Sequence, residues 1–344
     1  MRFVALALLL TAALPAAAQQ KSPPLKKGVN EVIISEGKYW LDIPNSYDGR
    51  KPTPVIMFMH GKTIDLNADN ARGQLDNPFV TQMKKRGWIA MAPVMPKEHR
   101  PHWFENGGSL AILDAMMVDL KKKVSTSFIL CSGFSAGANY TMGFGQHRSY
   151  HTHFAGYLVM AGGGWVDKDG PEDLKRKPIW LGCGDQDNDS YDDKLNTTGG
   201  ARKTAAELKE AKFESAYDEF PKVGHVMDGK MVEKAVAWVD AHLGEFQAIG
   251  AFNKAGQLKD SAPGDGLRAL EGAQKSKCPE YWTKKVEAGI TSLTDAARRA
   301  IAEAEANPDA AAAKAALTKL GQEYVGTSVE KLVKEALGRV GQKK

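Results

Sequence analysis

The fold is decided by residues 127–145, which read SFILCSGFSAGANYTMGFG. The run FILC at 128–131 is apolar throughout, as in a strand that is buried on both faces. GFSAG at 133–137 then fits the G-x-S-x-G pattern, in which a sharp strand-to-helix turn exposes a serine hydroxyl and glycines relieve crowding. The residues after the turn are helix-like. The segment therefore predicts a strand, a tight turn that carries Ser135, and a helix.

Strands and helices alternate on either side of this segment. Two β-rich runs separated by Glu36-Gly37 lie between residues 29 and 43, as in a hairpin. Further strands are indicated at 55–59 (VIMFM), 88–94 (WIAMAPV), 156–162 (GYLVMAG), 178–184 (PIWLGCG) and 213–220 (FESAYDEF). Helices are indicated at 109–123, 201–211 and 231–243. This alternation predicts an α/β fold with a mostly parallel central sheet and helices on both faces, and ligands on such sheets bind beyond the carboxyl ends of the strands.

The character of the chain changes near Gly250. The stretch NKAGQLKDSAPGDG at 253–266 is linker-like, and the residues from 290 onward are Ala-rich and helical, with a break at Asn307-Pro308. Their apolar stripes are narrow, which is typical of a small helical appendage. We therefore expect one main domain at 29–247, followed by a linker and accessory helical region at 248–344.

The first residues read as a targeting segment. MRFVALALLLTAALPAAAQQ has a charge at Arg2, an apolar run and a small-residue cleavage site, which predicts a signal peptide at 1–18. The apolar run is shorter than the ~20 residues that span a bilayer. We expect a secreted or periplasmic protein without a transmembrane segment in its mature chain.

Charge and cysteine content narrow the classes of partner. The net charge of +5 comes from 46 basic and 41 acidic residues scattered along the chain, which indicates a solvated surface and not a nucleic-acid footprint. The three cysteines include no CxxC pair, so neither a zinc site nor a disulfide framework is indicated. Cys131 and Cys183 end predicted strands that have the strand at 156–162 between them, too far apart for a bridge.

A hydroxyl nucleophile needs a base, and His225 is the histidine best placed to act as one. It lies in PKVGHVMD, after the predicted strand 213–220 and before the helix 231–243. His147, His151 and His153 read as solvated surface residues, and His242 as a structural one. An acid that orients the imidazole should follow the strand 178–184, where Asp185, Asp187 and Asp189 are all candidates.

A serine nucleophile also needs donors for the oxyanion of its tetrahedral intermediate. The backbone N–H of Ala136 and those that follow His60-Gly61, at the end of the strand 55–59, are placed to supply them.

At this point the sequence resembles a known superfamily. YWLDIPNSYDGRKPTPVIMFMHGKT, WFENGGSLAILDAMMVDL, FILCSGFSAGANYTMGFG, GCGDQD and FPKVGHVMD occur in the order and spacing of the α/β-hydrolases, over about residues 29–245. They resemble its secreted esterase branch, which includes polyhydroxybutyrate depolymerase-like, feruloyl esterase-like and phospholipase/carboxylesterase-like proteins. The resemblance implies an α/β-hydrolase fold and selects Asp187 as the acid, three residues after Gly184. It also implies Lys62 as an oxyanion donor, with Thr63 as second choice, although relatives often carry Gly, Cys or an apolar residue there.

These features together predict a secreted serine hydrolase of carboxylic esters. Ser135 would be the nucleophile, His225 the base and Asp187 the acid, with Lys62 and Ala136 in the oxyanion hole. We expect no metal or organic cofactor, and a small-molecule or polymer-derived ester as substrate. Candidate substrate-binding residues, chosen because they are aromatic and follow strands, are Trp103, Phe104 and Trp165.

Two alternatives remain open from the sequence. The first is a serine peptidase on the same fold, because the same residues can cleave amides; no propeller or large cap domain accompanies the pattern. The second is a non-catalytic binding or envelope protein on a hydrolase scaffold, with the helical tail as its contact surface.

Overall fold

The computed structural model describes residues 24–62, 70–94, 108–189 and 196–342. The predicted signal peptide at 1–18 lies outside these residues. Within them, no helix combines the length and the apolar character needed to cross a bilayer.

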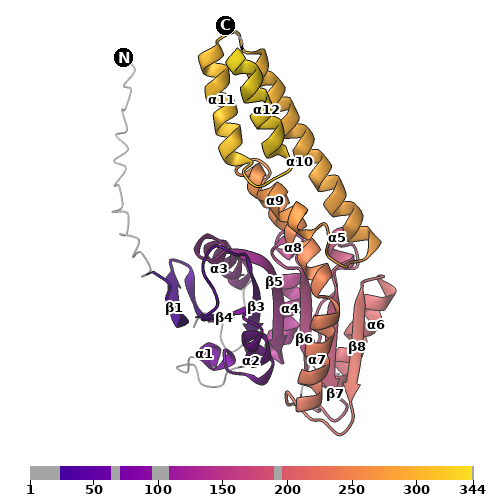
Figure 1. Ribbon diagram of the computed structural model, residues 1–344. Helices are drawn as coiled ribbons and strands as arrows, with labels where there is room; N and C mark the ends of the chain where they lie inside the picture. Colours follow the sequence, from indigo (N-terminus) through magenta and orange to yellow (C-terminus); the bar gives the residue numbers. More distant parts are fainter. Residues whose placement is uncertain (1–23, 63–69, 95–107, 190–195, 343–344) are drawn as a thin grey trace, which may run out of the picture.

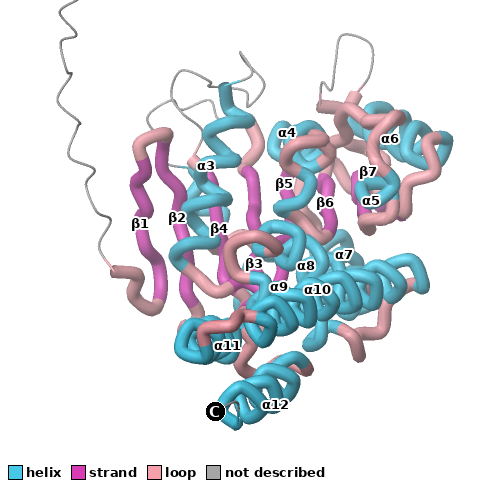
Figure 2. The backbone as a smooth tube through the Cα atoms, turned by 90° about the horizontal axis from the view of Figure 1, so that it is seen from above, coloured by secondary structure: helices cyan, strands magenta, loops and turns pink. Residues whose placement is uncertain are grey.

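An eight-stranded sheet forms the centre of the molecule, in the order β1-β2-β4-β3-β5-β6-β7-β8. Its strands are β1 (Gly28–Ile34), β2 (Gly37–Ile43), β3 (Thr53–Met59), β4 (Ile89–Pro93), β5 (Thr126–Phe134), β6 (Gly156–Met160), β7 (Ile179–Gly184) and β8 (Ser215–Phe220). The pairs β1–β2 and β2–β4 are antiparallel, and all other neighbours are parallel. Figure 2 shows the labelled strands from β1 to β7 in this order, with β1 at one edge. The predicted hairpin and the mostly parallel sheet are confirmed, and this topology with a strand–turn–helix at β5 is the α/β-hydrolase fold.

Both faces of the sheet centre are buried, and successive side chains of a strand there point to opposite faces. In β3, for example, Ile56 and Phe58 enter one hydrophobic cluster, whereas Val55, Met57 and Met59 enter the other. The strands of the sheet centre can therefore be apolar at every position, which is why they read as continuous apolar runs.

Helices cover the two faces, as predicted. The first face is covered by α1 (Asn70–Gln74), α2 (Pro78–Lys85), α7 (Gly229–Ala241) and α8 (Leu243–Leu258). The second face is covered by α3 (Gly108–Lys123), α4 (Ala136–Gly145) and α6 (Thr197–Glu210), and the short α5 (Glu172–Lys175) contributes Leu174 to the same cluster.

The remaining helices form an arm that projects away from the sheet (Figure 1). They are α9 (Pro263–Ala273), α10 (Glu280–Ala306), α11 (Ala310–Glu323) and α12 (Val329–Gln342). The predicted break at Asn307-Pro308 separates α10 from α11. Buried residues of α10, α11 and α12 share one hydrophobic cluster, among them Ile301, Leu317 and Val333. The tail is thus a helical appendage, as predicted.

The linker predicted at 253–266 is wrong. Its first residues continue α8 to Leu258, and its last ones begin α9, where Pro263 occupies a first-turn position that suits its missing N–H. The expected boundary at 247/248 falls inside α8. This helix lies directly on β5, since a Cβ on Gly250 would be 2.3 Å from the carbonyl oxygen of Ser127. Phe246 and Ile249 of this helix are fully buried. The helix α8 therefore belongs to both the sheet layer and the arm.

Candidate active site

Ser135 sits at the sharp turn between β5 and α4. Its backbone has φ 57° and ψ −123°, a conformation that L-residues rarely adopt and that is held here by the surrounding structure. The backbone N–H of Ser135 donates to the carbonyl oxygen of Met160 at 2.9 Å, which ties the turn to β6. The turn is a strained backbone geometry of the kind that accumulates at functional sites.

The two glycines of the motif are required by close approaches of the backbone. A Cβ on Gly133 would lie 2.4 Å from the carbonyl oxygen of Gly137, and a Cβ on Gly137 would lie 2.2 Å from that of Met59. Any side chain at either position would push the start of α4 away from β3 and β5. The glycines therefore set how closely the Ser135 turn packs on the sheet.

The imidazole of His225 lies between Ser135 and Asp187. Its Nε2 is 2.8 Å from the Oγ of Ser135, and its Nδ1 is 2.8 Å and 3.0 Å from the two carboxylate oxygens of Asp187. An ionised carboxylate only accepts hydrogen bonds, so this contact assigns the proton of neutral His225 to Nδ1 and leaves the Nε2 lone pair facing the serine hydroxyl. The structure thus brings together three side chains predicted from sequence, from the segments that follow β5, β7 and β8.

Of the three candidate aspartates, only Asp187 contacts Nδ1. Its carboxylate is fully buried, and its backbone carbonyl accepts a hydrogen bond from the hydroxyl of Thr198. The carboxylate of Asp185 instead accepts from the backbone N–H of Lys222 at 2.6 Å. Asp189 is 64% exposed, with one carboxylate oxygen 3.4 Å from Nε2 of His225. The three carboxylates therefore have different surroundings although they are close in sequence.

Neighbours that the sequence did not single out complete the surroundings of Asp187 and His225. The Sγ of Cys183 lies 3.8 Å from a carboxylate oxygen of Asp187. Burial, followed by the charge of Asp187, raises the pKa of the Cys183 thiol to about 12, so the thiol stays neutral and can donate to the carboxylate. The ring of Phe134 packs against the imidazole with 4.9 Å between centroids. Phe134 stands next to Ser135 in the motif, but nothing in the pattern indicates this contact.

The predicted oxyanion donors flank the nucleophile. A Cβ on Gly61 would be 3.1 Å from the Cβ of Ser135, so the chain from His60 to Lys62 runs beside the serine. Ala136 is the first residue of α4, and the N–H groups of a first helical turn have no intrahelical acceptor. The side chain of Lys62 is exposed. Thr63, the second choice, lies outside the described residues.

The predicted aromatic substrate residues are only partly described. Trp165 follows β6 and is 57% exposed. A Cβ on Gly162, three residues earlier, would lie 2.9 Å from the carbonyl oxygen of Ser135, so the loop that carries Trp165 starts at the serine turn. Trp103 and Phe104 lie outside the described residues.

The expectation that His151 and His153 are solvated surface residues is wrong. His151 is buried. The side chain of His153 is only 10% exposed, and its Nε2 lies 2.7 Å from a carboxylate oxygen of Asp114. Hydrogen-bonded burial of this kind leaves no trace in a hydropathy pattern. Across the described residues, no group of three or more His, Cys, Asp or Glu side chains is arranged to hold a metal ion.

Comparison with known proteins adds a likeness of fold. No protein-family model matches the sequence, and no curated protein matches it. A thermostable esterase is similar in structure at a TM-score of 0.46 and 18% identity over 62% of each chain, so the chain spans less than two thirds of the length of that relative. Acyl-protein thioesterase 2 of Zea mays is similar at a TM-score of 0.45 and 15% identity, over 60% of this chain and 99% of that one. A ferulic acid esterase of Anaeromyces mucronatus is similar at a TM-score of 0.44 and 16% identity, over 63% and 90%.

Proposed function

We propose that the protein is a serine hydrolase that cleaves carboxylic esters through an acyl-enzyme on Ser135. The observation that carries the proposal is the hydrogen-bonded series from the Ser135 hydroxyl through His225 to the buried Asp187 carboxylate. This series starts from a serine on a strained strand-to-helix turn. A nucleophile, a base within hydrogen-bond reach and a group that orients the base are what covalent acyl transfer needs.

In the first half of the reaction, the Oγ of Ser135 attacks the ester carbon and its proton passes to Nε2 of His225. The carboxylate of Asp187, which is buried from solvent, stabilises the imidazolium that forms. The backbone N–H groups of Ala136 and Lys62 donate to the oxyanion. The imidazolium then protonates the departing alcohol, and in the second half a water molecule, deprotonated by His225, releases the acid.

The natural substrate in this proposal is a small-molecule or polymer-derived ester. Trp165 supports an acyl or aryl contact because it is exposed on the loop that starts at the serine turn. We assign the same role to Trp103 and Phe104, and we retain residues 1–18 as the signal peptide of a secreted or periplasmic protein. Chromogenic esters of graded acyl length, together with a feruloyl ester, would rank these preferences, and cleavage of amides in preference to esters would favour a peptidase.

The deciding experiment is covalent labelling with a fluorophosphonate probe, followed by mass spectrometry. We expect one label on Ser135 and none on Ser135→Ala, which should remain folded and hydrolyse short esters at least about a thousandfold more slowly. Ser149→Ala, which removes an exposed hydroxyl elsewhere, is the matched control and should behave as the unaltered protein. A folded protein that takes no label and shows no turnover would instead be a binding protein on a hydrolase scaffold.

A further inference from the structure

A hollow of about 1,120 Å³ lies at the end of the sheet opposite Ser135. We call it the lysine hollow, because its lining includes Lys26, Lys27, Lys121, Lys122, Lys123 and Lys254. It opens at the first residues of β5, whereas Ser135 follows the last one. Ser135 comes eight residues after Ser127, which is about 26 Å at ~3.3 Å per residue of strand. The lysine hollow is therefore separate from the proposed active site.

The lining carries more positive than negative charge. Six lysines and two aspartates line the hollow, and both aspartates have hydrogen-bond or ion-pair partners. Asp48 accepts from the backbone N–H groups of Arg50 and Lys51, and Asp265 pairs with Arg268 at 2.6 Å. Asp119 pairs with Lys123 at 3.1 Å and offsets that lysine. The lysines come from the N-terminal segment, the end of α3 and α8, so compensation of a single helix dipole does not explain their convergence.

Lys121 is held in place by its neighbours. Its ammonium donates to Nδ1 of His153 at 2.8 Å and to the side-chain oxygen of Gln257 at 3.2 Å. Nε2 of His153 in turn donates to Asp114. Burial lowers the pKa of Lys121 to about 8, and burial together with Lys121 lowers that of His153 to about 4. At neutral pH, Lys121 is therefore a fixed cation that faces a neutral imidazole.

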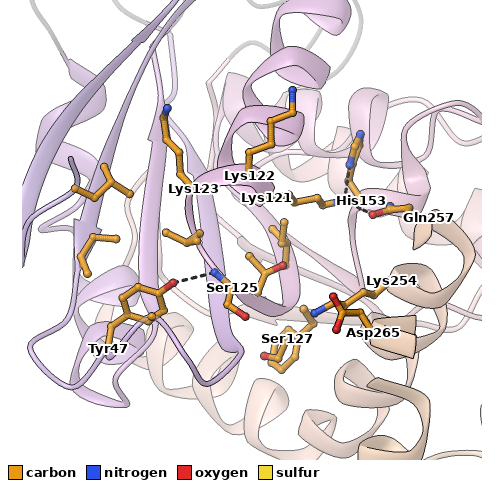
Figure 3. A pocket seen from close by; sticks show the side chains of 18 of the residues that line it. Tyr47, Lys121, Lys122, Lys123, Ser125, Ser127, His153, Lys254, Gln257 and Asp265 are labelled. Atoms are coloured by element: carbon orange, nitrogen blue, oxygen red, sulfur yellow. Dashed lines mark hydrogen bonds between the residues drawn. The ribbon is translucent and has the colours of Figure 1, made fainter. Parts of the chain in front are cut away.

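Lys254 is a second cation of the hollow, on α8 three residues before Gln257, which is a partner of Lys121. Lys254 also lines an adjoining hollow of about 600 Å³, to which Arg50 and Arg268 contribute. Both hollows share Ser127, whose Oγ is buried and has no hydrogen-bond partner among the described residues. Figure 3 shows Lys121 directed toward His153 and Gln257, and Lys254 near Ser127 and Asp265, while Lys122 and Lys123 point in another direction. A buried hydroxyl without a partner costs free energy that a bound acceptor would recover.

We propose that the lysine hollow binds a small anion with two oxyanion groups, either phosphates or carboxylates. One group would be held by Lys121, and the other by Lys254 with Ser127 and Arg50. Charge-assisted hydrogen bonds from ammonium and guanidinium groups are the strong contacts for such oxygens, and two cationic groups in one hollow favour a ligand with two anionic groups. The fixed position of Lys121 lowers the entropy lost on binding.

The test is calorimetric titration of the full chain at pH 7 and constant ionic strength, with inorganic pyrophosphate, citrate and, as the single-group comparison, orthophosphate. We expect pyrophosphate or citrate to bind at least about tenfold more tightly than orthophosphate. Lys254→Gln, which leaves the Lys121 cluster intact, should weaken that binding at least about tenfold, and Lys121→Gln should weaken it further. Lys314→Gln combined with Lys319→Gln on the exposed side of α11 removes two like charges and should change nothing.

The two sources of such an anion give different results. Binding of soluble pyrophosphate or citrate supports a free ligand, whereas binding only to vesicles that contain a lipid with a phosphomonoester headgroup would identify a membrane surface and overturn the small-anion proposal. Equal affinity for orthophosphate and for the two larger anions would overturn it too, as would unchanged binding in folded Lys254→Gln.

Discussion

Replacing Asp187 by Asn is the sharpest test of the proposed chemistry, because two neighbouring aspartates provide matched controls. An amide has the size of the carboxylate but offers an N–H donor as well as an oxygen. If that N–H faces Nδ1 of His225, the imidazole must carry its proton on Nε2, and it can no longer take the proton of Ser135. Replacing the orienting carboxylate of a Ser-His-Asp triad by an amide costs about four orders of magnitude in turnover. This corresponds to about 5.4 kcal/mol of activation free energy.

The controls should be much milder, for reasons that the contacts supply. Asp189 lies 3.4 Å from Nε2 but is 64% exposed. At the dielectric constant of water, its attraction for a charged imidazole is about 1.2 kcal/mol, so Asp189→Asn should lower turnover less than about tenfold. Asp185 accepts a backbone hydrogen bond at the turn of Lys222, and an amide oxygen can replace that acceptor. Asp185→Asn should therefore stay within about threefold of the unaltered protein.

The assay is steady-state hydrolysis of a short chromogenic ester, with thermal unfolding of each variant as the measure of folding. The reasoning requires folded Asp187→Asn to lose far more kcat than either control. It would be refuted by an Asp187→Asn protein that keeps more than about a tenth of its activity, or by Asp185→Asn as the most damaging of the three.

Three further outcomes are expected from the structure. Burial raises the pKa of Glu245 to about 7 from 4.5 in the unfolded chain, so the folded protein holds this proton more tightly. Stability should therefore fall as pH rises from about 4.5 to 7. Tm measured across that range should fall less in Glu245→Gln, and an equal fall in both proteins would contradict the assignment. A chain that ends at Gln247 interrupts α8 where it covers β5, so it should unfold at a markedly lower temperature than a chain that ends at Leu258. The chain that ends at Leu258 should keep ester hydrolysis within about tenfold of the full chain. Equal melting temperatures of the two would mean that the second half of α8 does not stabilise the sheet. Thiol titration under denaturing, non-reducing conditions should count all three cysteines as free, and a count of one would reveal a bridge.

The centre of the sheet could be read from the sequence because its strands are buried on both faces. β3, β6 and β7 appear as short apolar runs bounded by Gly or Pro, and the turn after β5 carries its own glycine pattern. The loop of His225 follows from the order of strands alone. For these parts of the chain, the hydrophobic effect and steric limits at the turn act through residues close together in sequence.

Other features depend on contacts between distant residues. The pattern could not distinguish Asp185, Asp187 and Asp189 by geometry, because the direction of each carboxylate is set by the turn after β7. The stretch 253–266 looked like a linker because it contains Gly, Asp and Lys, yet Ala255 within it is buried against the arm. His153 was expected at the surface, but Lys121 and Asp114 satisfy its ring nitrogens in a buried position. Each of these features concerns a polar or small residue whose environment is built by tertiary contacts.

The position of α8 has a consequence for the order in which the molecule can form. β5 lies in the middle of the sheet, but the helix that covers its start is encoded about 120 residues later, as the contact of Gly250 with Phe128 shows. During synthesis from the N-terminus, the part of β5 that α8 covers remains exposed until residues 243–258 have left the ribosome. An exposed apolar face of this kind binds chaperones and delays compaction.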